Sequence, residues 1–247
     1  MNSLDLLGLA FVLGFFGLMI ASTFVLRRRK ERMLREIPAF TRLQRAIGLA
    51  VEAGSRLHIS LGRGRLISTQ SAIGYVGLSI LDRIARSTSI SDRPPIATSG
   101  EGTLGILSQD TQRGAAKYLG VEFDPMRGQV TGLSPYSYAA GTQSLIQEED
   151  VGANLLIGSF GTEVALITEA AERSESMTLG GTDNITGQAV MFATAQEPLI
   201  GEETYAGGAY LGVGPMHIAS LYAQDILRWV LIGLILIGAI LKLLGVV

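Results

Sequence analysis

Cysteine is absent from the 247-residue chain. Its absence excludes disulfide bonds, thiolate catalysis and cysteine-ligated metal sites together. Histidine occurs only twice, at His58 and His217, and neither has the carboxylate spacing of a usual zinc site. We therefore expect no metal, with His58 as an ordinary strand residue rather than a base and His217 on a helix surface.

A large excess of positive or negative charge is also lacking, since the formal net charge is only −2. A chain of this charge is not built to coat nucleic acid, which is not an expected partner. Aromatic residues make up 6% of the chain and prolines number 7, whereas glycines number 31. Many glycines with few prolines favour tight turns and close backbone packing over disorder.

Two long hydrophobic runs mark the chain, at residues 6–26 and 229–247. Each is long enough to cross the ~30 Å hydrocarbon layer of a bilayer as a helix. The first run contains no charge, and the one charge inside the second, Lys242, lies near its end, where a long side chain can reach the headgroups. We predict two transmembrane helices, with the bilayer as a partner.

The order of charges around the first run predicts a retained anchor. A cleaved signal peptide carries cations before its apolar stretch, but here only Asp5 precedes the run. The cations follow it, at Arg27, Arg28, Arg29, Lys30, Arg32 and Arg35. This order places residues 1–5 outside and residue 27 onward in the cytoplasm. Arg228 and Trp229 then anchor the cytoplasmic end of the second helix, and both termini face out.

The basic stretch has two interpretations. We favour topogenic charge that meets anionic lipid over a specific lipid or nucleic-acid contact, because no aromatic residues interleave with the arginines.

Small residues recur at helical spacing in the first span, at Ala10, Gly14, Gly17 and Ala21. Such a face lets another helix approach closely, either the second span or another copy of the chain. The alternative is that glycine and alanine are simply common in membrane spans.

The region between the spans alternates strand and helix patterns. A basic and amphipathic connector covers residues 27–55, with a new helix after Pro38. An α/β domain covers residues 56–213, and a stalk helix at 214–228 continues into the second span. Strands are expected at about 56–61, 96–98, 129–133, 154–158 and 177–179. This alternation predicts a mostly parallel, Rossmann-like sheet of about five strands with helices on both faces.

Two details of this region are expected near its end. Asp183 is expected to cap a helix that contains Ile185, Ala189 and Phe192. The glycine-rich segment 197–213 is hard to assign, with a further strand expected at 210–213.

Glycine and hydroxyl residues gather in the turns that follow the expected strands. Ligands of open parallel sheets bind at these carboxyl ends. The same residue types also make turns tight and cap helices, and we favour this structural interpretation. The candidate ligand-binding residues are Arg63, Gly64, Arg65, Ser99, Gly100, Ser134, Ser159, Gly161, Thr162 and Gly181.

Charge distinguishes these turns from one another. Glu101, Glu163 and Asp183 stand at helix starts, where they suit the helix dipole but would repel a phosphate. The turn with Arg63 and Arg65 offers two cations and free backbone N–H groups, so an anion is expected there. The alternative is that both arginines face water or the membrane.

Motifs of known chemistry are missing. There is no phosphate-loop motif and no nucleophile elbow. Residues 62–68 approximate the dinucleotide fingerprint, but Ser68 replaces the third glycine and the acidic residue expected after the second strand is absent. The acidic residues 148–150 are expected in a solvated loop rather than a cation site. We expect no cofactor and identify no catalytic residues.

The stretches TGLSPYSYAAGTQ (131–143) and LLIGSFGTEVALITEAAE (155–172), framed by two terminal spans, resemble an uncharacterised family of prokaryotic membrane proteins. The resemblance covers most of the chain and implies a prokaryotic plasma membrane. It implies no activity and no functional residues.

Three hypotheses of function follow. The first is a membrane-anchored scaffold without catalysis, which self-associates or docks a partner protein. The second is a membrane-tethered binding module for a small anionic ligand, such as a nucleotide, at the strand ends. The third is an enzyme of unrecognised type, which only the fold class supports.

Overall fold

A computed structural model describes residues 3–28, 34–67, 71–88 and 91–245. These residues form two compact units. One contains the described parts of 1–35 and 214–247, and the other is Glu36–Val213.

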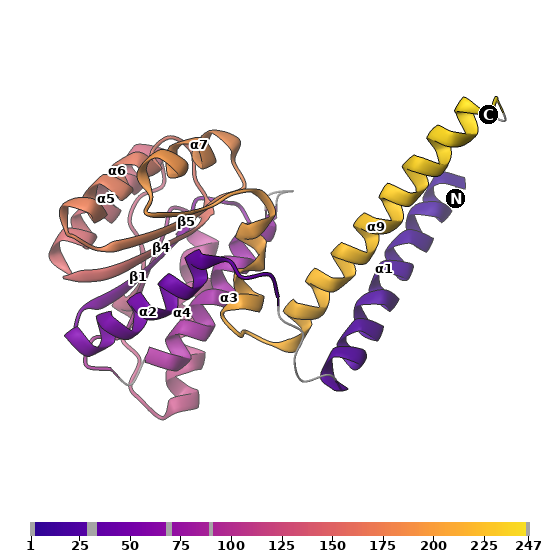
Figure 1. Cartoon of the computed structure of the whole chain (residues 1–247). Helices are drawn as coiled ribbons and strands as arrows, with labels where there is room; N and C mark the ends of the chain where they lie inside the picture. Colours follow the sequence, from indigo (N-terminus) through magenta and orange to yellow (C-terminus); the bar gives the residue numbers. More distant parts are fainter. Residues whose placement is uncertain (1–2, 29–33, 68–70, 89–90, 246–247) are drawn as a thin grey trace. The chain divides into compact units, whose positions relative to one another are not determined.

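The first unit is a pair of helices, α1 (Ser3–Arg28) and α9 (Pro215–Leu243), which pack against each other in antiparallel directions (Figure 1). Both are long and apolar enough to cross a membrane. A proline in the first turn starts α9, which then runs unbroken through the predicted stalk and the second hydrophobic run. At ~1.5 Å per residue, its 29 residues exceed the ~30 Å of a hydrocarbon layer.

One side of α1 is partly covered, and it is not the small-residue side. The partly covered residues are Phe15, Leu18, Met19, Ser22 and Thr23. The small residues Ala10, Gly14, Gly17 and Ala21 are exposed. No atom lies within 4 Å of a Cβ built at Gly14 or Gly17. The small-residue side therefore faces away from α9, and its contact with another copy stays a prediction.

The predicted membrane-interface residues are described in part. Arg27 and Arg28 end α1 and are described by backbone alone, while Arg29 and Lys30 lie outside the described residues. Arg228 contacts Asp225 at 3.6 Å, and Trp229 is exposed.

The second unit is built on a parallel sheet, which confirms the predicted fold class. It has six strands, rather than about five, in the order β3-β2-β1-β4-β5-β6. Their bounds are β1 Arg56–Gly62, β2 Ile96–Ser99, β3 Gly128–Val130, β4 Val151–Ser159, β5 Met177–Gly181 and β6 Glu197–Leu199.

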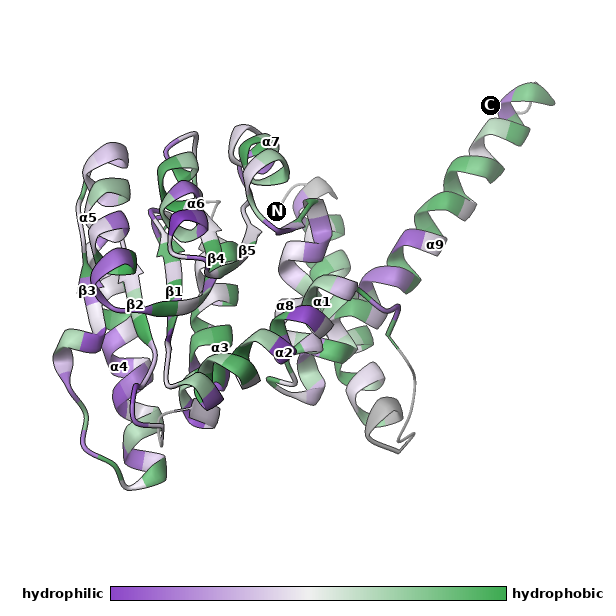
Figure 2. Cartoon of the chain, turned by 60° about the vertical axis from the view of Figure 1, so that its left-hand side comes forward, coloured by the Kyte–Doolittle hydropathy of each residue, from purple (hydrophilic) through white to green (hydrophobic). Residues whose placement is uncertain are grey.

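Helices cover both faces of this sheet (Figures 1 and 2). One face carries α2 (Pro38–Ala53), α3 (Ser71–Thr88) and α4 (Gly102–Leu119). The other carries α5 (Pro135–Glu148), α6 (Val164–Arg173) and α7 (Ile185–Thr194). The change of face occurs at α5, which connects β3 at one edge of the sheet to β4 beyond β1.

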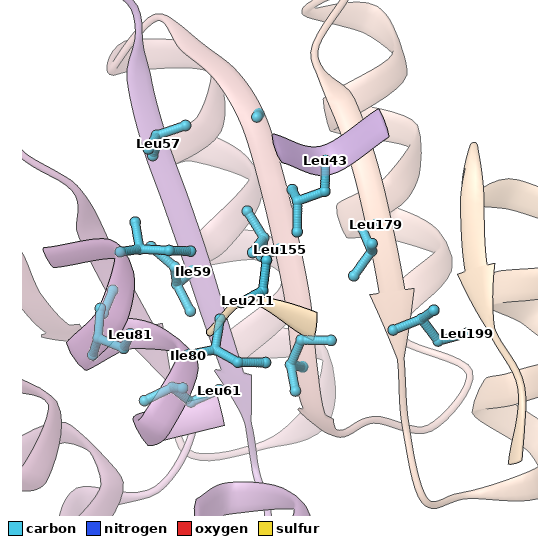
Figure 3. Close-up of a cluster of buried hydrophobic side chains, with 14 of the residues drawn as sticks. Leu43, Leu57, Ile59, Leu61, Ile80, Leu81, Leu155, Leu179, Leu199 and Leu211 are labelled. Carbon is cyan, nitrogen blue, oxygen red and sulfur yellow. The ribbon is translucent and has the colours of Figure 1, made fainter. Parts of the chain in front are cut away.

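The main core lies between the sheet and the helices α2 and α3. Alternate residues of β1 point into it, at Leu57, Ile59 and Leu61, as the twofold period of a strand requires (Figure 3). Leu43 of α2 is fully buried in the same cluster. The compact unit therefore begins before the predicted residue 56, because α2 supplies part of its core.

The strand expected at 210–213 is wrong. A 3₁₀ helix (Gly201–Ala206) leads into α8 (Gly207–Tyr210), and Leu211 N and Val213 N then donate to Gly207 O and Gly208 O. The edge strand β6 lies earlier, at Glu197–Leu199. The Tyr210 ring stacks on Phe40 of α2 with centroids 4.9 Å apart.

The helix expected to contain Ile185, Ala189 and Phe192 is confirmed as α7, but its expected cap is wrong. Asn184, not Asp183, caps the helix by accepting from Thr186 N and Gly187 N. Ile185 and Phe192 are 84% and 71% exposed, and the buried residues are Gly187 and Met191. A Cβ at Gly187 would lie 2.3 Å from Phe160 O, so this glycine lets α7 approach the neighbouring loop. That close approach decides which side of an apolar helix faces inward.

Candidate functional site

The direction in which successive strands are added to the sheet reverses between β1 and β4. From β1 the chain moves outward through β2 to β3, and from β4 it moves outward in the opposite direction through β5 to β6. The carboxyl ends of β1 and β4 therefore form a topological switch point, where open α/β sheets bind their ligands.

The two strands approach each other unusually closely at these ends. Gly62 has φ +67°, and a Cβ there would lie 2.6 Å from Ser159 O. Arg63 N donates to Ser159 O at 3.0 Å, and Gly100 N donates to Gly62 O at 2.8 Å. Only glycine suits position 62, since both its backbone conformation and its closeness to Ser159 exclude a side chain. These contacts fix the start of the loop that carries Arg63.

A cavity of about 310 Å³ opens beside these strand ends. Its lining residues come from the last position of β4 and from the loops after β1, β4 and β5. They are Arg63, Gly64, Arg65, Ser159, Phe160, Gly161, Glu163 and Asn184. Five of the predicted ligand residues are thus brought together, namely Arg63, Gly64, Arg65, Ser159 and Gly161.

The other five predicted residues do not line this cavity. Ser99 donates to Glu101 O at 3.2 Å, and Ser134 caps α5 by accepting from Ser137 N. Gly181 packs against Thr204, while Thr162 O accepts from Ala165 N in the turn before α6. Gly100 lies under the Arg63 side chain, because a Cβ there would be 2.2 Å from Arg63 Cγ. The alternative role of these residues, in tight turns, close packing and helix caps, therefore accounts for their positions.

Arg63 is the most informative residue of the cavity. Its side chain is 29% exposed, and Nη2 donates to Leu133 O at 3.4 Å. Nη1 lies 3.9 Å from Glu163 Oε1. Nε is buried and has no hydrogen-bond partner among the described residues. A buried donor without a partner costs about 1–3 kcal/mol, so this guanidinium has donor capacity that an anion beside it would satisfy.

Glu163 and Asn184 also line the cavity, and the predicted site omitted both. The Glu163 side chain is 7% exposed, and Oε1 accepts from Gly161 N at 3.0 Å. Asn184 uses Oδ1 to cap α7. The position of Asn184 directly before a helical pattern is the signal that could have marked it as a cap. No sequence signal places Glu163 beside Arg63, since the two residues are far apart in the chain and lie on different loops.

A chain of buried polar side chains crosses the sheet from Ser176, just before β5, to Thr98 of β2. Asn154 Nδ2 donates to Ser176 Oγ at 2.7 Å, which leaves Asn154 Oδ1 to accept from His58 Nδ1 at 2.8 Å. His58 Nε2 then accepts from the Thr98 hydroxyl at 2.8 Å. His58 is a strand residue, as expected, but it is fully buried and links β4, β1 and β2.

This polar chain ends at Tyr138 of α5. The Tyr138 hydroxyl lies 3.5 Å from Thr98 Oγ1 and contacts Ser60 Oγ closely. Burial lowers the pKa of His58 to about 4 and raises the pKa of Tyr138. Both groups are therefore uncharged at neutral pH. The Tyr138 ring packs beside Gly100, which in turn contacts the Arg63 side chain. The polar chain therefore reaches the residues that Arg63 packs against.

We expect acid to destabilise the protein through His58. Its pKa is about 4 in the folded state against 6.5 for an unperturbed histidine, so the unfolded state binds more protons between these values. Stability falls as pH drops from 6.5 toward 4, by about 3 kcal/mol for the full shift. Thermal unfolding of the full chain in detergent, followed by circular dichroism, would measure the fall.

The matched variant is His58→Gln. It removes the titrating group, so its stability should be lower at pH 7 but should decline less as the pH falls from 6.5 to about 4. Equal declines in the two proteins would contradict the assignment.

Comparison with known proteins identifies a family. A family described as a domain of unknown function (DUF6754) matches residues 2–247. The chain therefore belongs to this family, and the expected resemblance to an uncharacterised family is confirmed. No curated protein and no solved structure matches the chain.

Proposed function

We propose that this member of the DUF6754 family is a membrane-anchored binding protein for a small anionic ligand. The observation that carries the proposal is the cavity at the β1–β4 switch point, where the buried Arg63 Nε has no described partner. Arg65 lines the same cavity and adds a second guanidinium. Guanidinium groups favour phosphate and carboxylate ligands because they donate two parallel hydrogen bonds.

The size of the cavity favours one small ligand. Its volume of about 310 Å³ is at the lower end of the ~300–1,000 Å³ typical of ligand sites. The loop also differs from a dinucleotide site, in which the helix begins within the glycine motif. Here residues 63–67 are not helical, and α3 is described from Ser71 onward. Side chains, rather than the α3 N-terminus, therefore supply the charge for the anion, as in a site for a mononucleotide or a sugar phosphate.

We expect Arg63→Ala to weaken anion binding by roughly 10-fold or more, since a charge-assisted hydrogen bond contributes about 1.5–3 kcal/mol. Isothermal titration calorimetry of the full chain in detergent, with a panel of phosphates and nucleotides, would measure it. Arg173→Ala is the control, because Arg173 pairs with Glu169 on the exposed face of α6. Heat signals absent for every wild-type titration would overturn the proposed function.

The proposed membrane topology rests on charge order and on the helix pair. The cations at residues 27–35 follow the first hydrophobic run, and this bias favours a cytoplasmic α/β domain. In the antiparallel pair, the start of α1 and the end of α9 lie at the same end (Figure 1). Both termini would then lie outside, and the ligand would come from the cytoplasm.

The absence of cysteine allows a direct test of this topology. We expect Leu244→Cys, near the end of α9, to react with a membrane-impermeant maleimide on intact cells. Ser144→Cys, on the exposed face of α5, should react only after the membrane is opened. The reverse pattern of labelling would contradict the proposed orientation.

Self-association is a second candidate function. The exposed small-residue side of α1 favours it, because α9 leaves this side uncovered. A dimer formed there would make the protein a scaffold that presents two α/β domains.

We expect Gly14→Cys to form a disulfide-linked dimer when membranes are oxidised, and Leu18→Cys to stay monomeric. Leu18 is the matched control because it lies on the partly covered side of the same helix. Denaturing gel electrophoresis without reductant would show the dimer. Monomers for both variants would argue against this interface.

A further inference from the structure

We propose that Glu163 makes the cavity selective for phosphate monoesters of polyols, such as a sugar phosphate or a nucleoside monophosphate, over inorganic phosphate. The proposal rests on the proposed function and assigns a ligand class to the same site. In this assignment the arginines bind the phosphate, and the Glu163 carboxylate accepts hydrogen bonds from the ligand's hydroxyl groups.

The first step is that Arg63 and Glu163 do not share a direct hydrogen bond. Nη1 and Oε1 are 3.9 Å apart, whereas a direct charge-assisted hydrogen bond measures ~2.7–2.9 Å. Both side chains line the cavity, so a positive and a negative group face the same small space. A ligand that satisfies both groups needs an anion and a hydrogen-bond donor close together.

The second step concerns the capacity of the carboxylate. An ionised carboxylate has about four lone-pair sites and no donor. Within the part of the chain that the structure describes, the one hydrogen-bond donor to the Glu163 carboxylate is Gly161 N, at 3.0 Å from Oε1. Since the side chain is only 7% exposed, bulk water does not fill the remaining sites freely. Hydroxyl groups of a bound ligand would fill them.

The third step concerns which anions are rejected. At neutral pH inorganic phosphate still carries one or two hydroxyl groups, one of which can donate to Glu163, but it has no carbon skeleton that keeps its other, charged oxygens away from the carboxylate. A phosphate monoester places its carbon skeleton and hydroxyls on one side and its charged oxygens on the other. This polarity matches a cavity with Arg63 and Arg65 on one loop and Glu163 on another.

Asn184 adds a donor to this arrangement. Its Oδ1 accepts from Thr186 N and Gly187 N, which leaves the Nδ2 amide to donate to a ligand oxygen. The cavity volume of about 310 Å³ is at the lower end of the range for ligand sites, which favours a small ester such as a pentose phosphate.

The test is calorimetric titration of the full chain in detergent with ribose 5-phosphate and with inorganic phosphate. The wild type should bind ribose 5-phosphate more tightly. Glu163→Gln should bind ribose 5-phosphate roughly 10-fold more weakly and inorganic phosphate more tightly, because it loses acceptor strength and repulsion together. Glu169→Gln, on the exposed face of α6, is the control and should change neither affinity.

A wild-type comparison keeps the proposal testable if Glu163→Gln does not fold. Methyl phosphate has the same ester charge but no hydroxyl groups, so it should bind roughly 10-fold more weakly than ribose 5-phosphate.

Equal affinities for the two esters, or a Glu163→Gln change in the same direction for both phosphates, would overturn the selectivity proposal while leaving anion binding intact. Binding of the free amino acid glycine, together with no binding of any phosphate ester, would also overturn it. A zwitterion would then be the ligand that satisfies both Arg63 and Glu163. Failure of every anion, including inorganic phosphate, would instead reject the proposed function itself.

Discussion

The contact between the carboxyl ends of β1 and β4 determines where everything else at this edge of the domain can lie. Gly62 lies so close to Ser159 that a Cβ at position 62 would be 2.6 Å from the Ser159 carbonyl oxygen. Arg63 N donates a hydrogen bond to that same oxygen. Because the chain continues in opposite directions from these two strands, the loops that follow them diverge and leave the cavity between them. Nearer the middle of the sheet, the hydrogen bonds of His58 link β1 to both neighbouring strands, β4 and β2.

The fold class was predictable because its signal is repeated along the chain. Apolar strands alternate with amphipathic helices five times, and each repetition independently favours a parallel sheet. The sixth strand was not predictable, because Glu197–Leu199 is only three residues long and contains Pro198. The inward face of α7 was not predictable for a different reason. The helix is apolar all round, so periodicity could not distinguish Met191 from Phe192, and the close approach at Gly187 decided between them.

The candidate site was predictable as an edge of the sheet, but not as a set of contacts. Strand-end turns identified Arg63, Arg65 and Ser159 because the carboxyl ends of parallel strands share one edge. The same reasoning included Ser99 and Ser134, whose hydroxyls serve local turns and caps. Sequence patterns give the strand that a residue follows but not the direction of its side chain. The Arg63–Glu163 approach depends on that direction and on which strands are neighbours.

This juxtaposition resolves the apparent conflict between the charges of the turns. Considered turn by turn, Glu163 disfavours an anion and Arg63 favours one, so the two observations point to different sites. The structure places both residues in one cavity, with Arg63 Nη1 and Glu163 Oε1 3.9 Å apart and without a direct hydrogen bond between these atoms. A site built for a bare anion gains nothing from a buried carboxylate, which costs desolvation and repels the ligand. The carboxylate becomes useful only if the ligand itself brings donors, and this requirement narrows the ligand from any anion to a hydroxyl-bearing one.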